Sequence, residues 1–301
     1  MTKDRKRTIL VTGPTGTVGS EVVKQHASSS SGHNITRAAV HSQDKADKFK
    51  RDNRAVEIVK IDYNKPETIA NALSNADKLF WLTLPALDMK EISSNLVKEA
   101  KKNGVEHIVK LSVMGADAEP GTIIGRLHRQ EEKIIEESGI PYTFLRPGPF
   151  MQSFLPTKFF FGQTIKTQNA FYLPAGDGKV AFAGVRDIAA VAVQALTDDS
   201  RHVGKAYTIT GQEALSYGQV AEILSNEVNK RISYVDISEE ESRRGMKQIG
   251  MEDWLIDAIM EFFSIVRAGH GSQTTAIIEE IIGRTPISFQ QFARDYAEFF
   301  R

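Results

Sequence analysis

The feature that most constrains this chain is a glycine-rich turn directly after its first predicted strand. Residues 8–12 form a short β-branched run, and Gly13, Gly16 and Gly19 follow at three-residue spacing before a helical pattern begins. In the first βα turn of a dinucleotide-binding domain, such glycines permit a sharp turn, close approach of the backbone to a pyrophosphate, and close packing of the helix on the sheet. The helix N-terminus then attracts the anion. The cofactor-binding residues predicted here are Gly13, Thr15, Gly16, Thr17, Val18 and Gly19.

Strand and helix patterns alternate regularly through the first half of the chain. Further strands are predicted at residues 35–40, 56–61, 78–82, 107–111 and 142–146. This alternation is typical of βαβ units, and it predicts an α/β fold with a Rossmann-type, doubly wound parallel sheet. Residues 147–149 (PGP) end the pattern, because proline cannot continue a central strand. We therefore expect an NAD(P)-binding Rossmann domain at residues 1–150. A smaller, mainly helical α+β substrate or cap region is expected at residues 151–301, with some segments returning to the sheet.

The overall composition argues against several classes of protein. The 301 residues include 38 Lys and Arg and 38 Asp and Glu, and this zero net charge argues against nucleic-acid binding. The absence of cysteine excludes disulfides and thiolate metal sites, and we expect no metal. The apolar stretch Ile9–Val11 behind the basic N-terminus is too short for a secretory signal or a membrane span. We expect a cytoplasmic protein without membrane association; the sequence leaves its oligomeric state open.

The end of the second predicted strand bears on the choice between NAD and NADP. An Asp or Glu there would bind the ribose 2′-hydroxyl of NAD. This chain has no acid at that position and carries His41 and Ser42 instead, with Lys45 nearby. These residues tolerate a 2′-phosphate, so we expect NADP(H) to be favoured over NAD(H). His41 has a second interpretation, as a solvent-exposed loop histidine.

Other cofactor-binding candidates follow the third and fourth predicted strands. Asp62 can meet the adenine edge, with Tyr63 beside it, or it can cap the next helix. Thr83, Leu84 and Pro85 cross the carboxyl end of the fourth strand, where ligands bind in open α/β sheets. We predict that all of these residues contact the cofactor.

Several longer motifs are similar to those of one known family. They are residues 12–16 (TGPTG), 112–116 (SVMGA), 138–151 (SGIPYTFLRPGPFM), 175–179 (AGDGK) and 186–189 (RDIA). Together they resemble the NmrA-like branch of the atypical short-chain dehydrogenase/reductases, and within it the NADPH-dependent quinone oxidoreductase type, over residues 7–230. The resemblance implies a dinucleotide over the glycine turn. It places the nicotinamide end near residues 83–85 and near Gly148, Pro149, Phe150 and Met151. The family usually has Arg where this chain has His41, a departure that bears on the NADP preference.

The catalytic Tyr-x-x-x-Lys pair of the broader superfamily is absent. Counting back from Gly139, its two positions fall on Ile124 and His128. Ser112, at the end of the fifth predicted strand, still offers a hydroxyl to the cofactor. We predict His128 as a catalytic and cofactor-binding residue, and the resemblance supports this because related quinone reductases also carry a histidine there. An imidazole can hold ribose hydroxyls or pass a proton to an oxyanion. The alternative is a solvent-exposed helix histidine.

Two functions are consistent with these residues. The first is an oxidoreductase that transfers hydride from NAD(P)H to a small electron-poor acceptor such as a quinone. Phe150, Met151 and Phe154 would then line an apolar slot, with Phe150 and Phe154 contacting the substrate; the alternative places them in the core of the cap. The second function is a non-catalytic NAD(P) sensor that binds a partner protein. A nucleotide-sugar epimerase or dehydratase is disfavoured, because it needs the Tyr-x-x-x-Lys pair.

Overall fold

The chain divides into two compact units. The computed structural model describes residues 6–29, 34–52, 55–156 and 161–301. The first unit comprises Met1–Pro147 and Ile188–Thr208, and the second comprises Gly148–Asp187 and Ile209–Arg301. Each unit therefore contains two separate stretches of sequence, and each is described below by itself.

The first unit is built on a seven-stranded sheet. Its strands run in the order β3-β2-β1-β4-β5-β6-β9, and the pairs that join β3 through to β6 are parallel. The strands are β1 (Arg7–Thr12), β2 (Asn34–Val40), β3 (Glu57–Lys60), β4 (Lys78–Trp81), β5 (His107–Leu111), β6 (Tyr142–Pro147) and β9 (Lys205–Ile209). The strand order reverses between β1 and β4, as in a doubly wound sheet. The predicted Rossmann-type α/β fold is therefore confirmed.

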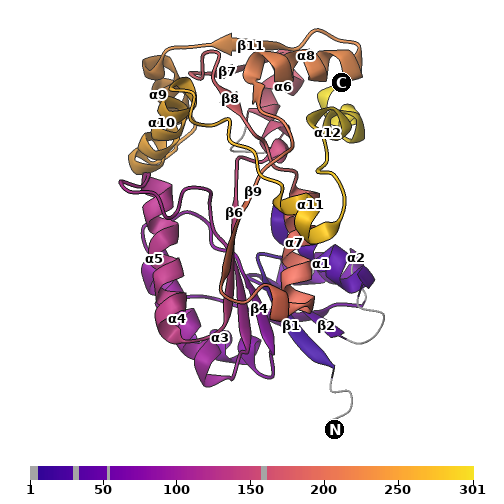
Figure 1. Ribbon diagram of the computed structural model, residues 1–301, viewed down its shortest axis with the longest axis vertical. Helices are drawn as coiled ribbons and strands as arrows, with labels where there is room; N and C mark the ends of the chain where they lie inside the picture. The colour runs from indigo at the N-terminus through magenta and orange to yellow at the C-terminus, as the bar shows by residue number, and fades with distance from the viewer. Residues whose placement is uncertain (1–5, 30–33, 53–54, 157–160) are drawn as a thin grey trace. The chain divides into compact units, whose positions relative to one another are not determined.

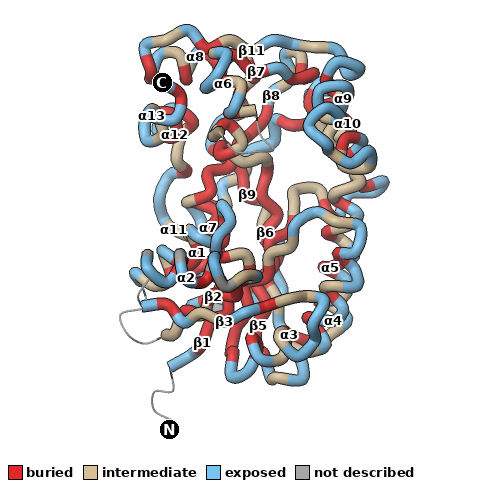
Figure 2. Tube along the Cα trace, turned by 180° about the vertical axis from the view of Figure 1, so that it is seen from behind, coloured by how far each residue is buried: buried red, intermediate tan, exposed pale blue. Residues whose placement is uncertain are grey.

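Helices cover both faces of this sheet. Figure 1 shows α1 (Thr17–Ser29) and α2 (Gln43–Asp52) on one side, and α3 (Pro66–Leu73), α4 (Met89–Lys102) and α5 (Ile123–Ser138) on the other. Strands covered on both faces must be apolar almost throughout. Accordingly, Ile9, Leu10 and Val11 of β1 are at most 1% exposed. Figure 2 shows the neighbouring central strands buried as well, whereas the outer turns of the helices are exposed.

The second unit packs short strands and helices around an aromatic core. β7 (Ala170–Leu173) pairs in parallel with β11 (Ser233–Asp236), and β8 (Lys179–Val180) pairs antiparallel with β10 (Leu215–Ser216). Its helical elements are η1 (Met151–Phe154), α6 (Gly162–Gln168), α8 (Tyr217–Val228), α9 (Glu239–Gln248), α10 (Asp253–Arg267), α11 (Ile277–Ile282), α12 (Phe289–Asp295) and α13 (Ala297–Phe300). The residues of α7 (Val185–Thr197) are divided between the two units, and η2 (Asp199–Arg201) belongs to the first.

Phe154 lies at the centre of the aromatic core of the second unit. Its side chain is fully buried and makes edge-on contacts with four other rings, those of Phe161, Phe171, Phe182 and Phe289, at centroid distances of 4.9–5.5 Å. Aromatic rings prefer this edge-to-face geometry. The structure therefore corrects the prediction that Phe154 contacts the substrate, because the ring has no exposed surface and belongs to the core.

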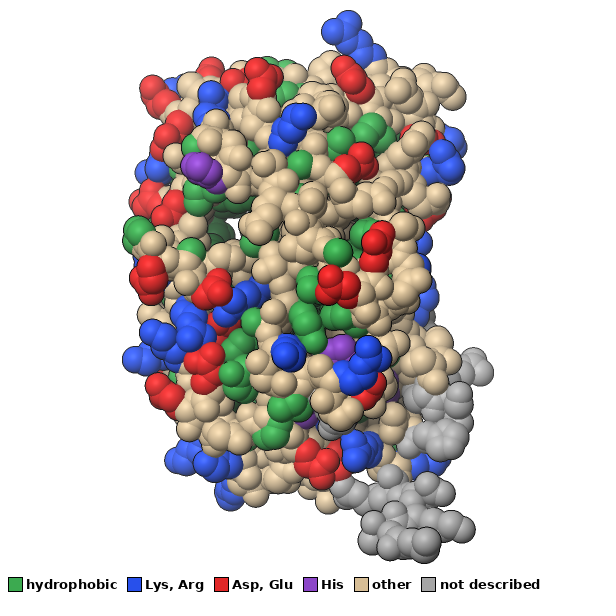
Figure 3. Space-filling model, in the orientation of Figure 1, with side chains coloured by type: hydrophobic (Ala, Val, Ile, Leu, Met, Phe, Trp, Pro, Cys, Tyr) green, Lys and Arg blue, Asp and Glu red, His purple; other side chains and the backbone are tan. Residues whose placement is uncertain are grey.

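The surface of the described chain carries charges of both signs. Figure 3 shows Lys and Arg side chains interspersed with Asp and Glu on one face. Several form exposed pairs along a helix, such as Arg243 with Glu239 and Arg244 with Glu240 in α9. Such pairs contribute about 0.3–0.5 kcal/mol each, so stability depends mainly on the two cores. Among the described residues, no helix is both long and apolar enough to cross a membrane.

Replacing Phe154 tests the core of the second unit. We expect Phe154→Ala to lower the free energy of unfolding by about 3–5 kcal/mol, because a large cavity replaces a ring with many contacts. Phe299 is 39% exposed, and Phe299→Ala serves as the control, with an expected loss of about 1 kcal/mol or less. Denaturant unfolding followed by circular dichroism measures both. Equal losses in the two variants would contradict the core position of Phe154.

Candidate functional site

The glycine turn joins β1 to α1, and its three glycines meet different requirements. Gly13 has φ +61°, in the left-handed region that favours glycine. A Cβ on Gly19 would lie 2.2 Å from the Gly13 carbonyl oxygen, so only glycine allows α1 to approach the end of β1 this closely. A Cβ on Gly16 would meet only that same oxygen, at 3.3 Å, and Gly16 is exposed. Gly13 and Gly19 therefore shape the turn, while Gly16 leaves bare backbone open to a ligand.

Thr12 fastens this turn to the neighbouring strand. Its hydroxyl donates to the carbonyl of Phe80 at 3.1 Å and accepts from the Leu82 N–H at 2.8 Å. These bonds connect the carboxyl ends of β1 and β4, the two strands between which the sheet order reverses. Ligands of open α/β sheets bind at such a reversal. Of the other predicted turn residues, Thr15 and Thr17 are exposed and Val18 is buried beneath them.

His41 and Ser42 lie at the carboxyl end of β2, as predicted from the sequence. His41 is exposed, and its Nδ1 lies 3.0 Å from the Ile61 carbonyl oxygen. The ring is thus hydrogen-bonded on one edge and open on the other, which fits both interpretations given above. Ser42 is half-buried, and the side chain of Lys45 lies outside the described part of the chain.

The structure tests one of the two interpretations of Asp62, the helix cap. Helix α3 begins at Pro66, and its N-cap residue is Lys65. The Asp62 carboxylate accepts from the Asn64 N–H at 3.1 Å and so closes a local turn. The helix-capping interpretation is therefore wrong, and Asp62 is only partly buried. Tyr63 is partly buried and packs edge-on against the core residue Trp81 at 5.5 Å, and burial raises the pKa of its hydroxyl.

The three predicted residues in the loop after β4, Thr83, Leu84 and Pro85, have different surroundings. Leu84 is 78% exposed and Pro85 is exposed as well, so both are open to a ligand. The Thr83 hydroxyl instead donates to Glu131 at 2.9 Å. Thr83 therefore belongs to a buried polar group, which we name the Lys110 cluster; its members are Thr83, Ser93, Lys110, His128 and Glu131.

The Lys110 cluster centres on a fully buried ion pair. The Lys110 ammonium lies 3.0 Å from Glu131 Oε2, and neither side chain has exposed surface. Ser93 donates to the other carboxylate oxygen of Glu131 at 2.5 Å. His128 Nδ1 lies 3.3 Å from Glu131 Oε2 and 3.5 Å from Lys110 Nζ. His128 is 6% exposed, so the alternative of a solvent-exposed helix histidine is wrong.

The sequence of α5 explains how His128 and Glu131 come to lie beside Lys110. Thr122 caps the helix by accepting from the Gly125 N–H at 3.0 Å, and Gly139 ends it with φ 75°. His128 and Glu131 are three residues apart and therefore share one face of α5. That face packs over β5, where Lys110 is one of five buried residues in succession.

Mutual contacts decide the charges of the cluster. Burial by itself would raise the pKa of Glu131, but the Lys110 charge and hydrogen bonds from His128 and Ser93 lower it from 4.5 to about 2. Burial lowers the pKa of Lys110, and Glu131 opposes that change. Because the carboxylate accepts from several donors, we assign the pair as ionised. Burial and the Lys110 charge lower the pKa of His128, so its ring is neutral near pH 7.

A second buried network lies beside the first. Arg146 of β6 bonds both oxygens of Glu132, at 2.9 and 2.8 Å, and also pairs with Asp117. Ser112 donates to Glu132 at 2.7 Å, so its hydroxyl is left only as an acceptor toward a ligand. Sequence reasoning missed Lys110, Glu131, Glu132 and Arg146. A signal was present, because a charged residue inside an otherwise apolar strand needs a buried partner.

The predicted residues after β6 belong to the second unit. Gly148 donates its N–H to the Ile209 carbonyl at 2.8 Å, and Met151 donates to Ala183 at 3.0 Å. Met151 is 2% exposed, whereas Pro149 and Phe150 are half-buried. Pro149 also lines a cavity of about 580 Å³, which we name the aromatic cavity. Its ring-bearing walls are Phe161, Tyr172, Phe182, Tyr217, Phe262 and Phe263.

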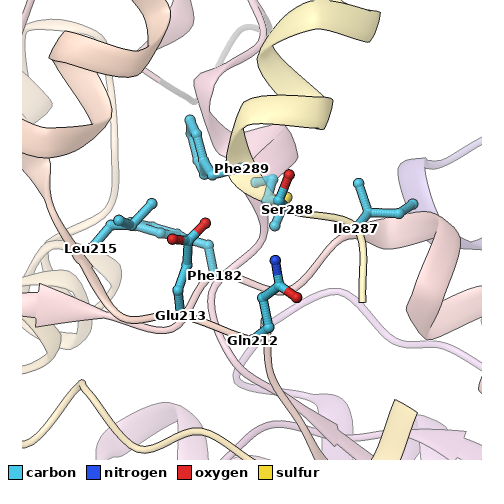
Figure 4. A pocket seen from close by; sticks show the side chains of 9 residues that line it. Phe182, Gln212, Glu213, Leu215, Ile287, Ser288 and Phe289 are labelled. Carbon is cyan, nitrogen blue, oxygen red and sulfur yellow. The ribbon is translucent and has the colours of Figure 1, made fainter. Parts of the chain in front are cut away.

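A narrower pocket of the second unit is not a ligand site. Figure 4 shows its walls, which include Phe182, Gln212, Glu213 and Phe289. Its interior has no space for a water molecule. The aromatic cavity is therefore the better candidate for an apolar ligand in this unit.

Removing the Glu131 charge tests the buried pair. We expect Glu131→Gln to lower the free energy of unfolding by about 3–5 kcal/mol at pH 7, because Lys110 loses its counter-ion. Since the native pKa of Glu131 is about 2 against an ordinary 4.5, this stabilisation is complete above pH 4.5 and is lost as the pH falls toward 2. The difference in free energy of unfolding between wild type and Glu131→Gln should therefore become smaller as the pH falls from 4.5 toward 2. Glu136→Gln, at a partly exposed pair with Arg129 on the same helix, should cost about 1 kcal/mol or less.

Comparisons with known proteins bear on this site. A family model described as the NmrA-like family matches residues 5–298. The NAD(P)H azoreductase of Xenophilus azovorans is 35% identical over 294 residues, covering 97% of this chain and 99% of that protein. The NADPH-dependent quinone oxidoreductase of Escherichia coli has a similar structure, with TM-score 0.80 and 25% identity, covering 95% of this chain and 98% of that one. The structure of the triphenylmethane reductase of Citrobacter sp., solved with NADP(H), is also similar. It has TM-score 0.79 and 26% identity, covering 96% of this chain and 99% of that one. On its motifs, its doubly wound sheet and these matches, the chain belongs to the NmrA-like family.

Proposed function

We propose that this protein is an NAD(P)H-dependent oxidoreductase that reduces a small, planar, electron-poor acceptor such as a quinone. The observation that carries the proposal is the bare backbone of Gly16, exposed between β1 and α1 where the strand order reverses. A pyrophosphate needs such an approach to the backbone, together with a helix N-terminus. Support comes from the relatives, whose names describe NAD(P)H-linked reduction of azo compounds, quinones and triphenylmethanes.

In this proposal the first unit binds the dinucleotide. The turn from Gly13 to Gly19 holds the pyrophosphate, and Asp62 lies toward the adenine. His41 and Ser42 lie toward the adenosine ribose, where the absence of an acid favours NADP(H). Leu84 and Pro85 form an apolar wall, and His128 lies toward the nicotinamide half. The bound reduced nicotinamide supplies a hydride, and a proton completes the conversion of a quinone to a hydroquinone.

The second unit binds the acceptor in the same proposal. The aromatic cavity has a size suited to a molecule of a few rings, since ligand pockets are typically about 300–1,000 Å³. Its walls are mainly rings and aliphatic side chains, against which a planar acceptor can stack. Pro149, in the segment that continues the chain from β6, contributes to the cavity wall. Phe150, in the same segment, is half-buried and contacts the acceptor in this proposal.

A bulky side chain at Gly16 tests cofactor binding. We expect Gly16→Val to weaken NADPH binding by roughly tenfold or more, because its side chain occupies the space that the pyrophosphate needs. The fold should persist, since a Cβ there meets only one backbone oxygen at 3.3 Å. Calorimetric titration measures affinity, and thermal melting checks the fold. Wild-type affinity in a folded Gly16→Val variant would overturn this placement.

Turnover separates an oxidoreductase from a sensor. We expect steady oxidation of NADPH when p-benzoquinone is added, faster than that of NADH, as measured by loss of nicotinamide absorbance. His41→Asp should reduce or reverse the preference, because a carboxylate repels the 2′-phosphate and binds the 2′-hydroxyl. Tight NADPH binding without oxidation by quinones, azo dyes or triphenylmethane dyes would favour the sensor instead.

A further inference from the structure

Helix α9 forms one wall of the aromatic cavity and lies beside α10 (Figure 1). In a helix, residues three and four apart share a face. The face of α9 that borders the cavity, with the residue that ends the helix, consists of Glu241, Ser242, Gly245, Met246 and Ile249. The exposed ion pair of Arg244 with Glu240 lies on the other face. Gly245 therefore stands in the middle of the face that borders the cavity.

Gly245 has no structural requirement for glycine. A glycine inside a helix destabilises it relative to alanine, because ordering its backbone costs more entropy. Elsewhere in this chain close approach requires glycine, since a Cβ on Gly178 would lie 2.2 Å from the Val266 carbonyl oxygen. Gly245 has a helical backbone, and a Cβ there would meet no atom of the described residues within 4 Å, apart from the adjoining backbone of α9. The helix has room for a side chain at this position, so the glycine serves the space that it leaves free in the cavity wall.

Exposed apolar groups also line this cavity. Ile249 is 58% exposed and Tyr172 is 39% exposed. A ligand that covers such groups removes apolar surface from water, so exposed apolar side chains around a cavity are typical of a ligand site. Met246 and Met251, also in the wall, have flexible side chains that adapt to ligands of different shape. Among the described residues that line the cavity, Glu241 is the only charged one, so the surface offered to a ligand is mainly apolar.

The size of the cavity favours a ligand of several rings. Pockets of about 300–1,000 Å³ accommodate drug-sized molecules, and this cavity has about 580 Å³. A single ring fills only a small part of that space and leaves exposed apolar side chains in contact with water. The free energy of burial grows with the apolar area removed from water. A planar molecule of three rings therefore gains more from this cavity than a molecule of one ring.

We propose that Gly245 is a specificity-determining residue, which leaves the aromatic cavity wide enough for planar acceptors of three rings and so makes the protein prefer them to acceptors of one ring. In this arrangement the acceptor contacts the bare backbone of Gly245 and apolar side chains such as that of Ile249. Reduction of the bound molecule rests on the proposed function, whereas its binding in the cavity does not.

Binding in the absence of cofactor tests the size preference separately from turnover. Phenanthrenequinone has three fused rings, and without NADPH it has no source of hydride. We expect equilibrium dialysis of the cofactor-free protein to show binding of phenanthrenequinone that is tighter than binding of p-benzoquinone by roughly tenfold or more, because more apolar area is buried. Equal or weaker binding of phenanthrenequinone would overturn this inference and leave the proposed function in place.

A side chain at Gly245 tests the residue itself. Gly245→Leu should weaken binding of phenanthrenequinone and raise its KM by roughly tenfold or more, because leucine occupies space in the cavity wall. The KM of p-benzoquinone and the affinity for NADPH should stay unchanged. Each acceptor is compared with itself in the wild type, so differences in intrinsic reactivity cancel. The melting temperature should not fall, since leucine favours a helix more than glycine does.

Two further variants keep the result interpretable. Gly245→Ala should raise the melting temperature and weaken binding of phenanthrenequinone less than Gly245→Leu does, and it tests the position even if the leucine variant does not fold. Gln248→Leu is the matched control, because Gln248 is an exposed residue of α9 that does not line the cavity. It should bind both quinones as the wild type does.

The outcomes distinguish this inference from the proposed function. Equal losses for the two quinones in Gly245→Leu, or no loss for either in a folded variant, would overturn the role of Gly245. If phenanthrenequinone binds as expected and no acceptor oxidises NADPH, the proposed function fails and the size selection stands.

Discussion

Covering a parallel sheet on both faces is the constraint on which the first unit depends. Each central strand loses contact with water on both sides, so any charge it carries needs a partner. Lys110 on β5 and Arg146 on β6 carry such charges near the carboxyl ends of their strands. Helix α5 supplies consecutive acids for them, Glu131 for Lys110 and Glu132 for Arg146. Burial of the sheet and placement of α5 therefore depend on each other.

This pairing also brings functional groups to the end of the sheet where ligands bind. Glu131 binds Thr83 and His128 as well as Lys110, so one carboxylate connects the loop after β4 to α5. Glu132 likewise holds Ser112 in place. Groups held this way lose little further conformational freedom when a ligand arrives. The buried ion pairs of Glu131 and Glu132 therefore both stabilise the first unit and orient the side chains of the candidate site.

The second unit meets a different constraint. Its strands are short and paired two by two, so backbone ladders contribute less than in the first unit. Aromatic rings and aliphatic side chains share the interior, with Phe154 and Tyr217 fully buried among them. Rings pack edge to face and leave irregular spaces at the border of the core. The aromatic cavity lies at such a border, where Tyr217 and Phe182 from the core meet side chains of α9 and α10.

The sequence by itself determined the fold of the first unit, because its signals are local. The glycine turn, the strand–helix alternation and the missing Tyr-x-x-x-Lys pair each depend on residues close together in the chain. Only the tertiary structure decided that His128 is buried beside a charged group, since its neighbour Lys110 lies 18 residues away on another element. It also decided that Asp62 closes a turn, that Thr83 points inward while Leu84 is exposed, and that Phe154 is core. Which neighbours surround a side chain depends on contacts between distant elements, and composition and periodicity along the chain do not contain that information.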